Sequence, residues 1–358
     1  MTPLASDQGP AGSPGIGVIG AGAWGRNLIR NFAALGCLRV IADSQPAVLE
    51  TMSALYPGVR TTCDPGELWA DGTVDGVVVA TTSSSHAGLA RGALEAGKHV
   101  MVEKPLALSV EDAEGLVTAA AAAGRILMVG HLLEYHPAVD MLRDLVRGGE
   151  LGEVYYAYSQ RVNLGKIRQD ENALWSFGPH DLSIILDLFG EHPERVSATG
   201  RAFLQPGLED VVFVSLMFPG RKLANLQLSW LDPHKLRRLT LVGSQRMVVF
   251  DDMEAAEKIR IYDKGVSGAE AGRIVDYKES LTLRFGEIRI PRVAMREPLR
   301  IECQEFLRAI ESGRPPRSDG LDGLRVVSVL EAAQRSLERG GVPVEPVVPA
   351  VADLSSRA

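Results

Sequence analysis

The chain has 358 residues, which is long enough for two hydrophobic cores rather than one. A hydrophobic content of 46% and a charged content of 23% are ordinary for a globular protein in water, and the net charge of −7 argues against broad nucleic-acid binding. No apolar run approaches the roughly 20 residues of a membrane span, and residues 1–14 lack the pattern of a signal peptide. Cys37, Cys63 and Cys303 show no metal-binding spacing, so we expect a cytoplasmic protein without a metal site.

Residues 15–25 read GIGVIGAGAWG and place glycines within and directly behind a short β-branched run. Gly20, Gly22 and Gly25 fit G-x-G-x-x-G, in which the glycines form a tight turn, admit a pyrophosphate and let a helix pack closely. An ordinary glycine-rich turn also fits this pattern. The neighbouring residues decide, because apolar residues then recur at helical spacing until Gly36. A strand–turn–helix unit that binds a dinucleotide is therefore predicted.

An acidic residue follows the next expected strand. Residues 38–42 form an apolar run that ends in Asp43, 23 positions after Gly20. In dinucleotide-binding units an acidic residue about 20 positions on binds the adenosine ribose hydroxyls. Because a carboxylate would repel a 2′-phosphate, Asp43 favours NAD over NADP.

Strands and helices alternate over residues 15–130, which predicts a doubly wound parallel sheet, a Rossmann domain. The expected helices include 89–97 and 109–124, the second with Ser109 as its N-cap. Further strands are expected within 75–86, where the strand runs into a polar loop, within 98–105 and within 125–131.

The pattern changes over residues 131–298, where strands follow one another with few helices between them. This predicts an α+β domain with a mostly antiparallel open sheet that binds substrate and mediates oligomerisation. One strand within 152–163 is expected to place Val154, Tyr156 and Tyr158 on one face. A helix is expected to begin at His180, and residues 273–291 are interpreted as a meandering loop with short strands.

The two ends of the chain frame these domains. Residues 1–14 are interpreted as a flexible tail and residues 341–358 as an extended, proline-rich tail. Residues 299–340 carry two helical patterns, and we expect these helices to return to the Rossmann domain.

Four short stretches in order make the chain resemble the Gfo/Idh/MocA family of NAD(P)-dependent oxidoreductases. They are GAGAWG at 20–25, VVVATTSSSH at 77–86, EKP at 103–105 and GPHD at 178–181. The resemblance covers roughly residues 15–340 and includes the closing stretch 319–336. The glycine motif is shared by many folds, whereas EKP followed by a distant glycine-x-histidine is much more specific.

The resemblance implies Lys104 and His180 as catalytic residues. Lys104 ends an expected parallel strand, where ligands of such sheets bind, and can stabilise a sugar alkoxide; the following peptide bond to Pro105 is typically cis in the family. His180 is suited to accept a hydroxyl proton near neutral pH. The alternatives are a surface lysine in a salt bridge and a capping or core histidine.

The cofactor contacts implied by the resemblance lie at the ends of the expected parallel strands. They are Gly20, Gly22, Ala23, Trp24, Gly25, Asp43, Thr81, Thr82, His86, Glu103 and Lys104. For His86 a role at the start of a helix is an equal alternative.

Two positions depart from the family pattern. Ser176 stands where members often have an aspartate four residues before the catalytic histidine, and Thr82 stands where they often have a proline. A carboxylate that orients His180 or binds a second hydroxyl is therefore missing. Asp181 adjoins His180 but is expected to point elsewhere on a helix.

Stretches 130–139 and 161–181 are similar to the 3-dehydrogenases of nucleotide-linked N-acetylamino sugars or their uronates. This similarity implies substrate contacts from the following residues, which are able to bind charged groups or cover a sugar face: Lys104, Arg161, Asn163, Arg168, Asn172, Trp175 and His180. For Arg161 a solvated sheet position, and for Trp175 core packing, are alternatives of equal weight.

These observations together predict an NAD-dependent oxidoreductase that moves a hydride between a sugar ring carbinol, at C3 of a nucleotide-linked amino sugar or uronate, and nicotinamide. Whether His180 or Lys104 is the base stays open. A cyclitol or aminocyclitol dehydrogenase, a ketosugar reductase and a non-catalytic dinucleotide-sensing protein are alternatives. We expect a small sugar as partner, no nucleic acid, no membrane, and a homodimer or homotetramer.

Overall fold

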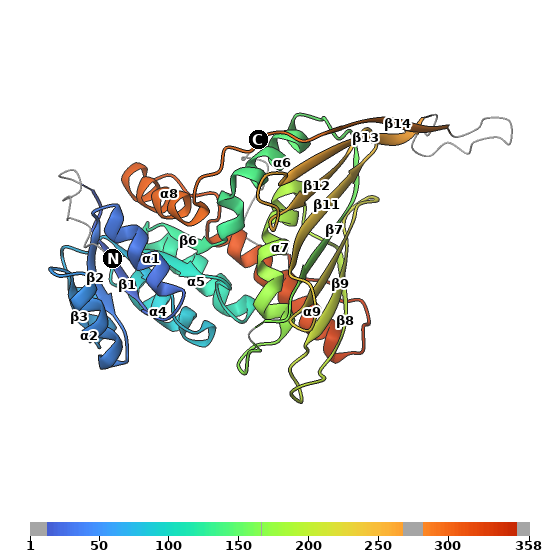
Figure 1. The fold of residues 1–358 in the computed structure, drawn as a ribbon. Helices are drawn as coiled ribbons and strands as arrows, with labels where there is room; N and C mark the ends of the chain where they lie inside the picture. The colour runs from blue at the N-terminus through green and yellow to red at the C-terminus, as the bar shows by residue number, and fades with distance from the viewer. Residues whose placement is uncertain (1–12, 166, 268–281, 349–358) are drawn as a thin grey trace. The chain divides into compact units, whose positions relative to one another are not determined.

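The computed structural model describes residues 13–165, 167–267 and 282–348 (Figure 1). The chain divides into two compact units. The first unit contains the chain up to Tyr135, the segment Glu297–Glu331 and the described residues from Val347 onward; the second contains His136–Arg296 and Ala332–Pro346. The last helix, α9 (Gly320–Glu338), contributes residues to both.

The first unit is built on a six-stranded parallel sheet with the order β3-β2-β1-β4-β5-β6. The strands are β1 (Ile16–Ile19), β2 (Leu38–Ala42), β3 (Arg60–Thr62), β4 (Gly76–Val79), β5 (His99–Glu103) and β6 (Leu127–Gly130). Every residue of β1 and β4 is buried, as expected for central strands covered on both faces. The strand order reverses direction beside β1, and ligands of open parallel sheets bind at such a point. The predicted Rossmann sheet is confirmed.

Helices cover the two faces of this sheet through separate apolar clusters. They are α1 (Gly25–Ala34), α2 (Pro46–Leu55), α3 (Pro65–Ala70), α4 (Ser83–Glu95), α5 (Val110–Ala123), α8 (Pro298–Ser312) and the short 3-10 helix η1 (Leu132–Tyr135). The predicted cap of α5 is present, because the Ser109 hydroxyl accepts a hydrogen bond from the Asp112 amide. The prediction of a polar loop after β4 is partly wrong, because α4 already begins at Ser83.

The second unit contains an eight-stranded mixed sheet with the order β14-β13-β12-β11-β7-β10-β9-β8. Among the described strands of this sheet, only β7 and β10 pair in parallel, so the predicted mostly antiparallel sheet is confirmed. The strands are β7 (Val154–Val162), β8 (Arg195–Arg201), β9 (Val211–Met217), β10 (Leu223–Ser229), β11 (Leu236–Gly243), β12 (Met247–Asp251), β13 (Ile259–Ser267) and β14 (Thr282–Arg289).

Two helices, α6 (Pro137–Arg147) and α7 (Ala173–Phe189), belong to this unit. Helix α7 packs against β7, β9 and β10 and so covers one face of the sheet (Figure 1). Every second side chain along these strands points to the opposite face, where Tyr158 and Phe213 are about 40% and 45% exposed. The sheet therefore has one covered and one open face.

Two expectations for this sheet are corrected. Val154 does not share a face with Tyr156 and Tyr158, because the ladder between β7 and β11 is irregular at Gly243 and Val154 turns into the core. Residues 282–289 form the single strand β14 rather than a loop with short strands, while residues 273–281 of the same stretch lie outside the described part. Among the described helices, none combines the length and apolarity needed to cross a bilayer.

Candidate active site

The glycine turn joins β1 to α1 in the first unit. Gly20 adopts φ +96°, a conformation that side chains disfavour, and a Cβ there would lie 2.5 Å from the Ala80 carbonyl oxygen. A Cβ on Gly25 would lie 1.9 Å from the Gly20 carbonyl oxygen, so only glycine allows α1 to approach the strand this closely. Both glycines are therefore required by the protein's own fold.

Gly22 differs from its two neighbours in the motif. It is exposed, and a Cβ built there would meet no atom within 4 Å. The N-terminus of α1 beside it carries no side-chain cap. An uncapped helix N-terminus behind open space presents backbone N–H groups to an anion. The turn therefore fits the pyrophosphate of a dinucleotide.

Asp43 follows β2 and faces this turn. One carboxylate oxygen accepts a hydrogen bond of 2.8 Å from the Ala21 amide, and the other accepts one of 2.9 Å from the Gln45 amide. These bonds fix the carboxylate beside the glycine turn, where the ribose hydroxyls of a bound dinucleotide lie in this type of fold.

Lys104 follows β5, and the Lys104–Pro105 peptide bond is cis, as the family resemblance implied. The preceding Glu103 is buried and accepts hydrogen bonds from the Trp24 indole and, at 3.3 Å, from the Lys104 amide. Burial raises the pKa of Glu103, and this effect outweighs the hydrogen bond from Trp24 and the charge of Lys104, which both lower it. Glu103 thus joins Trp24, the residue directly before α1, to the segment that carries Lys104.

His86 lies in the first turn of α4 and is 1% exposed. Its Nδ1 lies 2.8 Å from the Pro105 carbonyl oxygen and its Nε2 lies 3.3 Å from the Thr81 carbonyl oxygen. The imidazole therefore ties the turn after β4 to the turn that holds Lys104. This position favours the alternative of a helix-start role, in which His86 positions its neighbours. The expected cofactor residues Thr81 and Thr82 lie in the same segment, directly after β4 and before α4.

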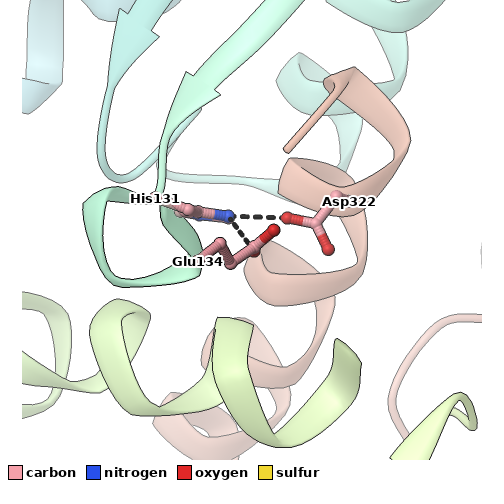
Figure 2. A group of neighbouring side chains, drawn as sticks. All are labelled: His131, Glu134 and Asp322. Atoms are coloured by element: carbon pink, nitrogen blue, oxygen red, sulfur yellow. Dashed lines mark hydrogen bonds and ion pairs between the residues drawn. The ribbon is translucent and has the colours of Figure 1, made fainter. Parts of the chain in front are cut away.

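A buried charged cluster lies at the end of β6 and was not singled out from the sequence. His131 Nδ1 is 2.6 Å from an Asp322 carboxylate oxygen and 3.4 Å from one of Glu134 (Figure 2). Burial by itself lowers the pKa of His131, but the hydrogen bonds with Asp322 and Glu134 outweigh burial and raise the pKa to about 10. The imidazole is therefore cationic and balances buried carboxylate charge.

These three groups have ligand atoms within 4.8 Å of one another, a spacing that a metal ion could use. The 2.6 Å contact between His131 and Asp322 is a hydrogen bond, so a cation would have to displace a tightly held proton. Nearby, burial and the charge of Glu103 raise the pKa of Glu302 well above its usual range. The buried, hydrogen-bonded geometry gives this cluster a structural role within the first unit.

Helix α7 of the second unit carries His180, but it does not begin there as expected. It begins at Ala173, because the Asn172 side chain caps it by accepting a hydrogen bond of 3.2 Å from the Trp175 amide. Pro179 lies inside the helix rather than at its start. Ser176 and His180 are four residues apart and so lie on one face of the helix.

Asn172 also donates from its side-chain amide to Glu209 and Gln334, at 2.7 and 3.0 Å, so its expected contact with substrate competes with a structural role. Arg161, 7% exposed on β7, donates two hydrogen bonds to Asp181, the next residue along α7 after His180. Asp181 therefore points away from a role beside His180, as expected.

A cavity of about 490 Å³ lies beside α7 in the same unit. Its lining includes Asn163, Arg168, Ser176, Phe177, Lys235 and Arg237. Of the expected substrate residues in this unit, two line the cavity, Asn163 and Arg168. The other four are not among its lining residues: Arg161, Asn172, Trp175 and His180. The sequence prediction missed Lys235 and Arg237, although the basic run His234–Arg238, HKLRR, was a visible signal.

Two family models match successive parts of the chain. Residues 15–131 match the family model described as the oxidoreductase family with an NAD-binding Rossmann fold, GFO_IDH_MocA. Residues 139–249 match the GFO/IDH/MocA C-terminal domain. Together these matches cover more than half of the chain.

Individual relatives are similar over most of their length. A UDP-N-acetylglucosamine 3-dehydrogenase from Acidithiobacillus ferrooxidans is 28% identical over 313 residues, covering 87% of this chain and 93% of the relative. A crystal structure of that enzyme superposes with a TM-score of 0.76 at 28% identity, covering 90% of this chain and 97% of its own. An inositol 2-dehydrogenase from Paenarthrobacter aurescens is 29% identical over 340 residues, covering 91% of this chain and 96% of the relative.

Proposed function

The chain belongs to the Gfo/Idh/MocA family of oxidoreductases with an NAD-binding Rossmann fold, and we propose that it oxidises C3 of a nucleotide-linked N-acetylamino sugar or its uronate. The observation that carries this proposal is the similarity, over nine-tenths of the chain, to a UDP-N-acetylglucosamine 3-dehydrogenase. The motifs EKP and GPHD support it, because their resemblance to the family implies Lys104 and His180 as the catalytic pair. Ser176 in place of an aspartate distinguishes the chain from the inositol-dehydrogenase pattern and supports a sugar rather than a cyclitol.

We propose NAD rather than NADP as the cofactor. The glycine turn and the uncapped end of α1 would hold its pyrophosphate, and Asp43 would bind the ribose hydroxyls. The Asp43 carboxylate is fixed by the Ala21 and Gln45 amides and would repel a 2′-phosphate at this position. Bound NAD would supply the acceptor for the hydride that leaves the sugar carbinol.

The protein's own contribution is proton transfer and charge stabilisation at the sugar hydroxyl. His180 accepts the hydroxyl proton, and Lys104 stabilises the oxygen as negative charge develops on it. Glu103 and His86 hold the segment that carries Lys104, through the Lys104 amide and the Pro105 carbonyl respectively. Helix α7 presents His180 and Ser176 on a common face. In the same proposal, three further residues of the second unit contact the substrate: Arg161, Asn163 and Trp175.

The test is a screen of purified protein against UDP- and dTDP-linked amino sugars and uronates, myo-inositol, and the corresponding ketosugars with reduced cofactor. Formation of reduced nicotinamide is followed at 340 nm with NAD and with NADP. We expect turnover with a nucleotide-linked sugar and NAD. Preferred turnover of myo-inositol would favour the cyclitol alternative, reaction only with ketosugars would favour the reductase, and inactivity with every compound would favour a dinucleotide sensor.

The open face of the second unit supports a homodimer or homotetramer. Several large side chains on that face are 38–50% exposed: Tyr156, Tyr158, Phe213, Met217 and Leu223. The strand registers bring Leu223 opposite both Tyr156 and Met217, so these three apolar side chains lie in one row across the open face. A second copy of the same face would cover it. We also propose a cytoplasmic location, because the three cysteines are unpaired thiols.

A further inference from the structure

The cavity beside α7 is strongly basic. Three of its lining residues, Arg168, Lys235 and Arg237, carry positive charge, and none of its lining residues is acidic. Asn163 and Ser176 add polar groups to the same wall. A hollow of about 490 Å³ is of the size that holds a small molecule.

Arg237 is held in place by the protein itself. Its Nη1 donates to the carbonyl oxygens of Val162 and Leu236 at 3.0 and 2.8 Å, and its Nη2 donates to the Asn163 side chain. The guanidinium lies 5.3 Å from the centre of the Phe177 ring. These three hydrogen bonds use part of a group that has five N–H donors. The orientation of the group is therefore fixed while donor capacity remains for a ligand.

Arg237 has no ion-pair partner of its own among the described residues. No described carboxylate lies within ion-pair distance of it. Asp181 and Asp252 are close enough to raise its pKa, but Asp181 is paired with Arg161 and Asp252 lies 3.4 Å from the His136 ring. Burial and the charge of Arg161 lower the pKa of Arg237 to about 10. An anion bound in the cavity would supply the missing countercharge.

We propose that this cavity binds the oxyanion of the substrate, with Arg237 and Lys235 as specificity-determining contacts. This inference rests on the proposed function, since it assigns the charged part of a nucleotide-linked sugar to the cavity. A diphosphate and a uronate carboxylate share the required chemistry, because both present oxygen pairs that accept the N–H groups of a guanidinium. Lys235 adds a second charge from the segment that leads into β11.

The experiment compares Lys235→Gln and Arg237→Gln with the matched control Arg195→Gln. Arg195 is an exposed arginine on β8, so its loss changes net charge equally without altering the cavity. Calorimetry measures the binding of UDP, UDP-N-acetylglucosamine and UDP-N-acetylglucosaminuronic acid to the full chain with NAD present. We expect Kd to rise about tenfold to a hundredfold in each cavity variant, as for loss of a charge-assisted hydrogen bond, and to stay unchanged in the control.

The three ligands identify the source of the oxyanion. Weakened binding of UDP itself supports the cavity as a phosphate site, whereas a loss confined to the uronate supports it as a carboxylate site. Unchanged binding of all three ligands in Lys235→Gln and in folded Arg237→Gln overturns the proposal, as does an equal loss in Arg195→Gln. If the wild-type chain binds UDP through these residues but oxidises no sugar, the proposed function fails while the oxyanion site stands.

Discussion

Arg161 of β7 and Asp181 of α7 form a bidentate ion pair inside the second unit, with 2.6 Å between Nε and Oδ2 and 3.0 Å between Nη2 and Oδ1. The pair joins the covered face of the sheet to the helix that carries His180. The pair also holds Arg161 beside Arg237, and the charge of Arg161 lowers the pKa of Arg237. The pair therefore fixes the position of α7 on the sheet and shapes the charge of the neighbouring cavity.

Breaking this pair should destabilise the second unit. Arg161→Ala or Asp181→Ala leaves a buried charge without its partner, so we expect each to lower the free energy of unfolding by about 3–5 kcal/mol. The double variant should lose less than the sum of the two single variants. Urea denaturation measures all three, with Arg308→Ala, which breaks an exposed pair with Glu305, as the control that changes stability little. Additive losses would show that the two side chains do not depend on each other.

Asp43 should set the choice of cofactor. Asp43→Ala removes the carboxylate that accepts the Ala21 amide, so NAD should bind more weakly and the gap to NADP should narrow. Quenching of protein fluorescence by NADH and NADPH measures both dissociation constants. Asp43→Asn is the control, because it retains a hydrogen-bond acceptor of the same size for the turn. The assignment is wrong if the native protein already prefers NADP.

Lys104 and His180 should be required for turnover but not for cofactor binding. Removing a positioned acid–base group typically lowers the rate about 10²–10⁴-fold, so Lys104→Ala and His180→Ala should each lower kcat in this range while NAD still binds. The losses in the double variant should not add, because both residues act on one proton transfer. Single-turnover hydride transfer measures the effect, and Ser176→Ala, from the same face of α7, should have a smaller one. Near-normal rates in both single variants would contradict the mechanism.

The buried His131 should make stability depend on pH. Its pKa of about 10 in the folded protein lies above the ordinary histidine pKa of about 6.5, so folding favours the protonated form. Its stabilisation is fully present below pH 6.5 and is lost as pH rises toward 10. We expect the free energy of unfolding to fall over this window in the wild type and to fall less in His131→Gln. His234→Gln, at an exposed histidine, is the control and should keep the wild-type slope. Parallel slopes in all three proteins would refute the cationic assignment.

The open face of the sheet should mediate self-association. Tyr158→Asp places a charge on the open face beside Tyr156, so the sedimentation coefficient should shift toward that of a monomer. Leu55→Asp, at an exposed leucine of α2 in the first unit, is the matched control and should leave the assembly unchanged. A wild-type protein that sediments as a monomer at all concentrations would exclude the oligomer.

Local sequence pattern predicted the elements whose structure depends on near neighbours. The glycine turn, Asp43 after β2 and Ser109 as a helix cap are all read from a few adjacent residues. The start of α7 was predicted incorrectly because Pro179 is a stronger start signal than Asn172 when only the sequence is known. The Asn172 cap is supported by Glu209 and Gln334, which are distant in the sequence.

Periodicity and short motifs act over one turn or one strand, so they are enough to predict the order of strands and helices, the dinucleotide motif and the family. Only the tertiary structure paired His131 with Asp322, which are 191 residues apart, and placed Lys235 and Arg237 in one cavity with Asn163. Strand register and helix packing decide such contacts. The electrostatic free energy of a charged side chain depends on its final neighbours and its burial, and these exist only once the chain has folded.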